Sequence, residues 1–314
     1  MVAILLVIFV IGYAAITLEH TIHINKSATA LITAVLCWTL IVLNAPDSEI
    51  VVESLTHHLS AISEIVFFLL GAMTIVELID AHDGFQSITE SIKTTHKAKL
   101  IWLIAIITFF LSAVLDNLTT TIVMISILNK LIEDKKTKWM LLGLVIIASN
   151  AGGAWSPIGD VTTTMLWIGG QITPLNIVKQ VFFASLVSMV IPTIIISYMI
   201  KGQIALKQAP ADQGNTSSNL FERNLIFIVG IGALLFVPLF KTITHLPPYM
   251  GMLLCLGIIW VVTEILHKKK PSEERGVLSV NHAIQKIDTP SILFFFGILM
   301  SIASLEFVGV LPEL

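Results

Sequence analysis

Long apolar runs separated by short polar connections recur along the whole chain. A helix needs about 20 apolar residues to cross ~30 Å of hydrocarbon, and several uninterrupted runs reach or approach that length. We predict membrane-spanning helices at about 2–18, 28–44, 59–79, 178–200, 224–241, 248–266 and 291–310. The pattern therefore predicts an all-α protein that crosses a membrane several times.

The composition supports this prediction. Hydrophobic residues make up 55% of the chain and charged residues only 12%, whereas a soluble domain carries about 25% charged residues. The mean hydropathy is +0.91. The formal net charge of -3 gives no reason to expect a nucleic-acid partner. We expect an integral membrane protein whose surroundings are the lipid bilayer.

The charges of the connections orient the spans, because Lys and Arg collect on the cytoplasmic side of a membrane. The connection at 44–53 has no basic residue and is predicted to lie outside. The connections at 93–99, 130–138 and 267–276 are basic and are predicted to lie inside. We therefore expect a multi-pass protein of the cell's inner (plasma) membrane.

The apolar region at about 99–130 is interrupted by the polar sequence LDNLTTT, Leu115 to Thr121. Both ends of the region carry lysines that are predicted to face the cytoplasm. The arm after the interruption would be a helix of only ~18 Å, too short to cross. A re-entrant hairpin satisfies both constraints. Since bilayers tolerate irregular backbone only where protein or a wet cavity surrounds it, we expect the tip to lie inside the protein.

A second apolar region, at about 139–168, contains the sequence SNAGGAWSPIGDV, Ser149 to Val161. Its three glycines and Pro157 are residues that unwind a helix. The region is long enough for one crossing, so we predict a discontinuous helix. The two half-helix ends would point into the protein, where they can coordinate an ion.

A short internal repeat relates the two parts of the chain. Aligning Gly71 with Gly297 places FFLLGAMTIVELID against LFFFGILMSIASLE, and the predicted orientations of the two copies are opposite. This inverted repeat is typical of secondary transporters. We predict a first repeat at 1–200, a cytoplasmic linker at 201–222 and the start of a second repeat at 223–314. The same shift places the second copies of both polar motifs beyond the last residue, so the second repeat is expected to be incomplete.

The two interruptions supply the candidate ion site. A carboxylate inside the bilayer costs several kcal/mol and usually faces a cation, a cavity or a proton path, so Asp116 is the main candidate. A helix N-cap is the competing structural explanation. Neutral oxygens beside the carboxylate suit hard ions such as Na⁺. The expected Na⁺ ligands are Asp116, Asn117, Asn150 and Asp160. The wider set for ion binding and proton coupling adds Thr119, Thr120, Ser149, Gly152, Gly153, Ser156, Pro157, Gly159 and Glu64.

These residue types also have structural explanations. Threonine hydroxyls in membrane helices commonly donate to the carbonyl one turn earlier. Glycines commonly mark close helix packing, which would explain Gly152 and Gly153 but not their clustering with Pro157 and Asp160. Glu64 lies in the third predicted span and is a candidate proton carrier.

The motifs LDNLTTTIVM and SNAGGAWSPIGDVTTTMLW resemble those of the NhaD-type sodium/proton antiporters. These belong to the ion transporter superfamily, which includes arsenite pumps and divalent-anion symporters. The resemblance covers most of the chain and implies two inverted repeats, each with a re-entrant hairpin and a discontinuous helix. It also implies exchange of Na⁺ or Li⁺ for H⁺. The positions that it carries over are Asp116, Asn117, Thr119, Ser149, Asn150, Gly152, Gly153, Ser156, Pro157, Gly159 and Asp160.

We therefore predict a secondary transporter, not an enzyme, that exchanges Na⁺ or Li⁺ for H⁺ and serves pH homeostasis, with no cofactor other than the transported ion. One alternative is a Na⁺-coupled carboxylate or oxyanion transporter on the same fold, which would be expected to surround its anion with neutral groups only. An intramembrane aspartyl hydrolase that uses Asp116 and Asp160 is the alternative from another class. The sequence leaves a homodimer open.

Overall fold

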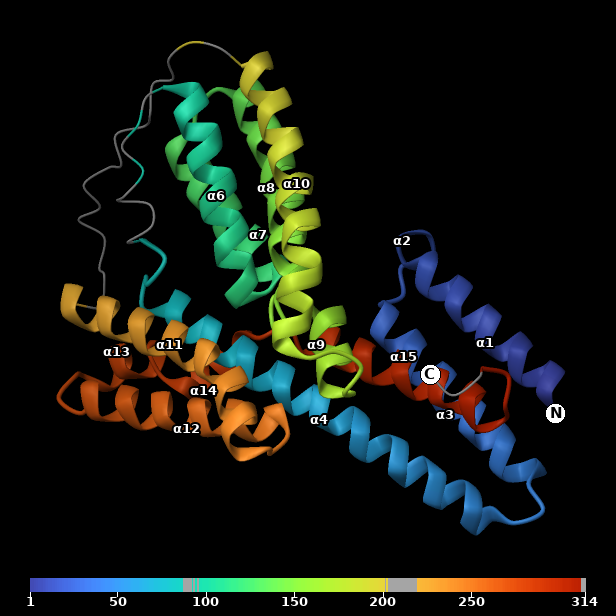
Figure 1. Ribbon diagram of the computed structural model, residues 1–314. Coiled ribbons are helices and arrows are strands. Elements are labelled where there is room, and N and C mark those ends of the chain that lie inside the picture. Colours follow the sequence, from blue (N-terminus) through green and yellow to red (C-terminus); the bar gives the residue numbers. More distant parts are fainter. Residues whose placement is uncertain (87–91, 93, 95, 201, 203–218, 312–314) are drawn as a thin grey trace. The chain divides into compact units, whose positions relative to one another are not determined.

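A computed structural model of the chain describes residues 1–86, 92, 94, 96–200, 202 and 219–311 (Figure 1). Seven of the described helices are long and apolar enough to cross a membrane. In chain order the helices are α1 (Val2–Thr17), α2 (Glu19–Ile22), α3 (Lys26–Asn44), α4 (Ser48–Ala81), α6 (Lys97–Leu115), α7 (Asn117–Leu131), α8 (Lys135–Ala154), α9 (Val161–Ile168), α10 (Pro174–Met199), α11 (Leu220–Thr244), α12 (Pro248–Leu266), α13 (Ser272–Val277), α14 (Val280–Lys286) and α15 (Thr289–Phe307). The prediction of an all-α polytopic membrane protein is confirmed. The predicted linker at 201–222 lies largely outside the described residues.

A helix covers each predicted span, and only α4 differs substantially in its boundaries. It begins at Ser48, well before the predicted start of its apolar run. No proline or glycine interrupts the sequence from Ser48 to Leu70. At the helix start, the Glu49 backbone N–H donates to Asp47 Oδ1 across 2.8 Å. The polar residues before the apolar run therefore extend the helix and do not form a longer loop.

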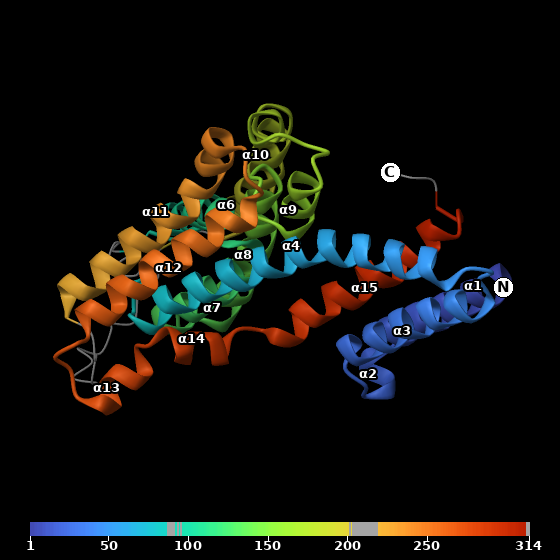
Figure 2. The ribbon, with the colours of Figure 1, turned by 90° about the horizontal axis from the view of Figure 1, so that it is seen from below.

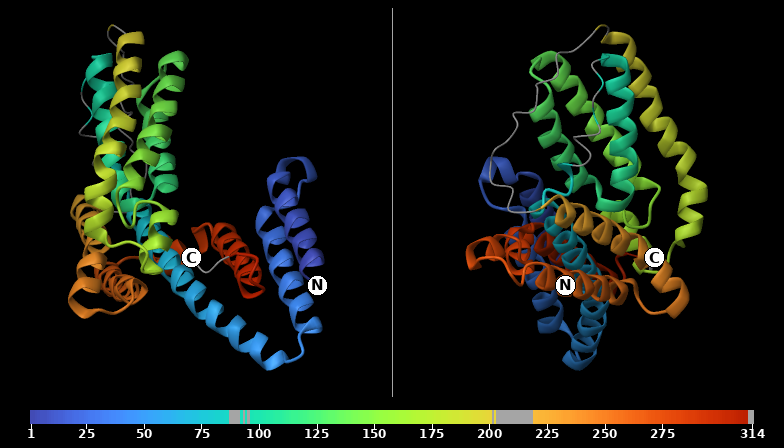
Figure 3. Two further views of the ribbon diagram at one scale, coloured as in Figure 1. Left: turned by 45° about the vertical axis from the view of Figure 1, so that its right-hand side comes forward. Right: turned by 90° about the vertical axis from the view of Figure 1, so that its left-hand side faces the viewer.

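The chain divides into two compact units, and the first comprises residues 1–70 and 287–314. Within it, α1 and α15 both pack against α3 (Figure 3). The α3–α15 contact is close at Gly297, where an added Cβ would lie 2.7 Å from the carbonyl carbon of Ala30. Trp38 donates its indole N–H to the Met300 carbonyl across 2.9 Å. The compact units and the predicted repeats divide the chain differently, so the repeat boundaries stay a prediction.

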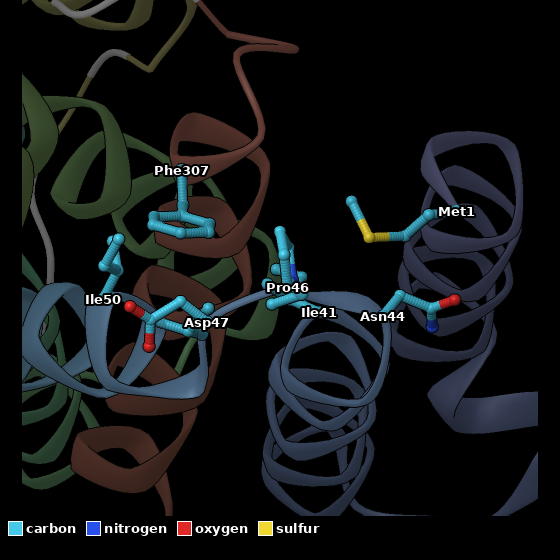
Figure 4. Close-up of a pocket in the computed structure, with 9 residues that line it drawn as sticks. Met1, Ile41, Asn44, Pro46, Asp47, Ile50 and Phe307 are labelled. Atoms are coloured by element: carbon cyan, nitrogen blue, oxygen red, sulfur yellow. The ribbon is translucent and has the colours of Figure 1, made fainter.

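The first unit also contains a cavity of about 210 Å³ (Figure 4). Its lining is mostly apolar, and the polar side chains among its lining residues are Asn44 and Asp47. None of the residues predicted to bind an ion lines this cavity. Both interruptions lie in the second unit.

The second unit, Gly71–Lys286, contains the hairpin formed by α6 and α7. Helix α6 packs against α7, α8 and α10, and α7 also packs against α8 (Figure 1). Helix α7 has 15 residues, so it is only ~22 Å long and falls short of the ~30 Å of a hydrocarbon core. Lys97 Nζ, at the start of α6, lies 4.0 Å from Asp134 Oδ2, which follows α7. Both arms of the hairpin therefore have their outer ends on the same side.

The ends of α4 and α12 meet through two buried histidines. His82 follows α4 and His267 follows α12, and they are 0% and 1% exposed. His82 Nδ1 lies 2.7 Å from the Leu78 carbonyl, which only accepts, so Nδ1 carries the proton. His82 Nε2 then accepts from His267 Nε2 across 3.3 Å. Helix α11 lies beside α12 (Figure 2), and its Glu222 forms an ion pair with Lys270 near His267.

Burial lowers the pKa of both histidines, and it lowers that of His267 to about 4. The folded protein then binds fewer protons than the unfolded chain, whose histidines have a pKa near ~6.5. Above pH ~6.5 the two neutral histidines cost the folded protein nothing. As the pH falls from there towards ~4, the free energy of unfolding decreases, because the unfolded chain takes up protons that the folded protein does not. We expect the melting temperature of the purified protein in detergent to fall between pH 7.5 and pH 5.

Replacing His267 should make this loss smaller. We expect His267→Gln to reduce the drop in melting temperature between pH 7.5 and pH 5 by on the order of 2 °C or more. His20→Gln, a change at an exposed position in α2, is the matched control and should leave the drop unchanged. Equal drops in the wild type and in His267→Gln would contradict the assignment of the pH dependence to this pair.

Candidate functional site

Asp116 forms the tip of the hairpin. It is the single residue between α6 and α7, and its backbone has φ 83 and ψ 156, a conformation that residues other than glycine rarely adopt. Its carboxylate caps α7, because Oδ1 accepts from the Thr119 backbone N–H across 2.8 Å and Oδ2 accepts from the Thr119 hydroxyl across 2.7 Å. The N-cap that competed with the ion-site explanation is therefore present.

The discontinuous helix is formed by α8 and α9. Helix α8 ends at Ala154, α9 begins at Val161, and the residues between them are not helical. Asp160 caps α9, and its Oδ1 accepts from the Thr162 backbone N–H across 2.8 Å. Both acidic candidates are thus N-caps of helices that begin inside the two interrupted apolar regions.

The hairpin tip and the interrupted helix meet at Asn117. Its amide Nδ2 lies 2.7 Å from Asp160 Oδ2 and 3.0 Å from Asn150 Oδ1. One turn further along α7, the hydroxyls of Thr121 and Ser149 lie 2.7 Å apart. Two segments that are far apart in the sequence thus bring carboxylate, amide and hydroxyl groups together.

The glycines of the interrupted helix lie where backbones touch. A Cβ added to Gly152 would lie 2.1 Å from the Phe109 carbonyl oxygen of α6. One added to Gly153 would lie 2.3 Å from the Gly159 carbonyl oxygen, and one added to Gly159 would lie 2.5 Å from the Ser112 carbonyl oxygen. Only glycine allows these approaches. The close-packing explanation thus extends to Gly159 as well as to Gly152 and Gly153.

Serine hydroxyls satisfy the exposed carbonyls at the same contact. Ser112 donates to the Ser149 carbonyl across 2.5 Å, and Ser156 donates to the Ala113 carbonyl across 2.5 Å. Ser112 was not among the predicted site residues. Its position one helical turn before Asp116 was the signal in the sequence that could have identified it.

The structure sorts the predicted residues into groups. Asn117, Asn150 and Asp160 meet at the junction, and Asp116 directly precedes Asn117 and bonds to Thr119. The Ser149 hydroxyl contacts Thr121 of α7. Ser156 points to α6, and the Pro157 carbonyl accepts from the Thr164 hydroxyl across 3.1 Å. Thr120 is fully buried, and its hydroxyl has no hydrogen-bond partner among the residues that the structure describes. Glu64 lies in the first unit. The roles of all these residues in ion binding stay predictions.

The two acids of this region, Asp116 and Asp160, are bonded to neutral groups among the described residues. Within the described part of the chain, neither Asp116 nor Asp160 forms an ion pair with a lysine or an arginine. Their hydrogen-bond donors are the neutral groups of Thr119, Asn117 and Thr162. Two carboxylates held only by neutral donors form a site that an external cation or a proton can complete.

A polytopic membrane protein in which a hairpin and an interrupted helix join at polar groups has the architecture of a secondary transporter. The profile of the family described as "Citrate transporter" (CitMHS) matches residues 4–314. The chain therefore belongs to the CitMHS family.

Several relatives carry antiporter names. The chain is 48% identical to "Sodium/proton antiporter 1" of Arabidopsis thaliana over 98% of its own length and 53% of the relative's. It is 46% identical to "Sodium/proton antiporter 2" of the same plant, over 97% of its length and 72% of the relative's. It is 28% identical to "Na(+)/H(+) antiporter NhaD" of Alkalimonas amylolytica, over 97% and 67%. The predicted relationship to NhaD-type proteins is confirmed, and the chain spans about half the length of the first of these relatives.

The close contact at Gly152 generates a test of the α6–α8 packing. We expect Gly152→Ala to lower the free energy of unfolding by about 1–3 kcal/mol, because the methyl group collides with backbone. Gly143→Ala is the matched control on the same helix, since an added Cβ there meets nothing within 4 Å. It should be neutral or stabilising by up to ~1 kcal/mol. Similar melting temperatures for the two variants would contradict the observed contact.

The backbone of Asp116 generates a second test. Glycine adopts positive φ without strain, so we expect Asp116→Gly to be more stable than Asp116→Ala by about 1–3 kcal/mol. Asp134 caps α8 with an ordinary φ of -61, so the same pair of substitutions there controls for the loss of a cap. The melting temperatures of the four variants measure this. A glycine–alanine difference at 116 no larger than that at 134 would show that the tip is not strained.

Proposed function

We propose that the protein exchanges Na⁺ or Li⁺ for H⁺ across the membrane. The observation that carries this proposal is the junction at Asn117, where two carboxylates without a basic partner lie among neutral oxygens. The antiporter names of the relatives support the same activity. Carboxylate and amide oxygens are suitable ligands for a hard monovalent cation.

The exchange follows from competition for the same carboxylates. A proton on Asp116 or Asp160 removes the negative charge that holds Na⁺, and bound Na⁺ disfavours the proton, so each ion displaces the other. Helix α8 ends at the junction, and the partial negative charge of its C-terminus also favours a cation. In this proposal Asp116, Asn117, Asn150 and Asp160 hold the cation, and Glu64 carries protons to or from the site.

The description of the family favours one second candidate, a Na⁺-coupled carboxylate transporter. The junction opposes it, because two carboxylates would repel an anionic substrate. An aspartyl hydrolase is opposed by the hydrogen bonds of the two acids. Such enzymes share a proton between paired carboxylates, whereas Asp116 bonds to Thr119 and Asp160 bonds to Asn117 and Thr162.

The remaining details of the proposal rest on the sequence. The basic connections support an orientation with these loops in the cytoplasm, and the weak internal repeat supports an inverted-repeat architecture. The plasma membrane is the location that we propose. A role in pH homeostasis follows from the exchange itself. We propose no cofactor besides the transported ion, and a homodimer is compatible with this reaction.

The charge of Asp116 is the direct test. In proteoliposomes that contain the purified protein and a pH-sensitive dye, we expect Asp116→Asn to reduce Na⁺-driven proton movement at least tenfold, because the variant cannot alternate between a proton and Na⁺. Asp134→Asn is the matched control, since it removes an acid that caps α8 and lies outside the junction. It should retain the activity of the wild type. Normal exchange by Asp116→Asn would show that this carboxylate does not couple the two ions.

A further inference from the structure

The Asn117 side chain has two amide hydrogens, and both are used inside the junction. One N–H donates to Asp160 Oδ2 across 2.7 Å and the other donates to Asn150 Oδ1 across 3.0 Å. A primary amide has only these two donors. The remaining polar atom of the side chain is its oxygen, which accepts.

The two neighbours of Asn117, Asn150 and Asp160, determine the direction of these hydrogen bonds. Asn150 Nδ2 donates to the Ile146 carbonyl across 2.8 Å, and a carbonyl only accepts, so the oxygen of Asn150 faces Asn117. At the other end, both oxygens of the Asp160 side chain accept hydrogen bonds. The nitrogen of Asn117 therefore faces both neighbours, and its oxygen is the side-chain atom left as a ligand for a cation.

The polar atoms of the junction that are still able to bind a substrate are therefore mostly hydrogen-bond acceptors. Asp116 and Asp160 each accept from main-chain N–H groups of the helices that they cap, and ionised carboxylates have no donor to offer. A cation binds to such a set of oxygens. A substrate carboxylate needs the opposite, namely N–H or O–H groups that point towards it and few negative charges nearby.

The amide of Asn117 would be a suitable donor for a carboxylate if Asp160 did not occupy it. The choice between a carboxylate and a cation is relevant to this family. Its description is "Citrate transporter", whereas several relatives are named as sodium/proton antiporters. We propose that Asp160 determines this specificity: it withdraws the Asn117 amide from substrates and adds a negative charge, so the site accepts Na⁺ and rejects carboxylates. This inference rests on the proposed function and assigns its selectivity to one residue.

Asp160→Ser tests the inference. Serine is a good N-cap, so α9 keeps its cap, but the shorter hydroxyl does not reach Asn117 as the carboxylate does. In the purified protein in detergent with Na⁺ present, we expect Asp160→Ser to bind citrate at least tenfold more tightly than the wild type, which corresponds to about 1.4 kcal/mol. Isothermal titration calorimetry with citrate measures this change.

Two matched variants separate the amide from the charge. Asp160→Asn removes the charge but keeps an oxygen that accepts from Asn117, so we expect a gain in citrate affinity below threefold. The double variant Asp160→Ser with Asn117→Ala removes the released donor, and we expect it to lose the gain. Should Asp160→Ser fold poorly, Asp160→Gly replaces it, because glycine costs only a few tenths of a kcal/mol as an N-cap.

The outcomes separate this inference from the proposed function. Wild-type protein that exchanges Na⁺ for H⁺, together with a folded Asp160→Ser that gains no citrate affinity, overturns the inference and leaves the exchange standing. An equal gain in Asp160→Asn overturns the role of the amide. A wild type that moves no Na⁺ and binds citrate overturns the proposed function itself. The expected pattern, a gain in Asp160→Ser alone that Asn117→Ala abolishes, supports both.

Discussion

The structure depends on the need to satisfy main-chain polar groups away from water. A buried N–H or C=O without a partner costs several kcal/mol in hydrocarbon, and this chain interrupts two of its apolar segments. The two interruptions satisfy each other. Hydroxyls of Ser112 and Ser156 bind carbonyls across the α6–α8 contact, and glycines let the two backbones approach. These contacts place both interruptions inside the protein, as the requirement demands.

The same requirement explains why the acids lie where they do. A helix that begins inside the bilayer leaves its first N–H groups without partners in the helix, and an aspartate at the N-cap accepts from one of them. A negative charge there also interacts favourably with the partial positive charge of the helix N-terminus. Asp116 does this for α7 and Asp160 for α9. The structural and functional explanations of these residues are therefore compatible. A carboxylate that accepts two hydrogen bonds from neutral donors keeps its charge and has further lone pairs to bind an ion. The cap holds the candidate ligand in place.

Much of this could be predicted from the sequence, because helices that cross a membrane follow from hydropathy and interruptions follow from Gly, Pro, Asp and Asn. The positions of α6, α7, α8 and α9 were predicted in this way. The start of α4 was not, because helix formers such as those from Ser48 onward also occur in polar loops. The sequence placed Asn117, Asn150 and Asp160 in one candidate site but did not predict the hydrogen bonds between them. Hydrogen-bond direction and the positive φ of Asp116 depend on tertiary packing, which the pattern of a single sequence does not encode.

Selectivity at this junction depends on which groups are left over after the fold has used its own. The fold needs donors for its carbonyls and acceptors for its helix starts, and these needs consume both hydrogens of Asn117 and one bond to each aspartate oxygen. What remains is oxygen lone pairs, which suit a cation, a proton or a neutral donor but not a carboxylate. A scaffold with the same interrupted helices but no acid at position 160 would instead leave one amide hydrogen of Asn117 unused, and this donor would suit an anion. In the proposed scheme, the balance between donors and acceptors at one pair of helix starts separates a cation carrier from a carboxylate carrier on the same fold.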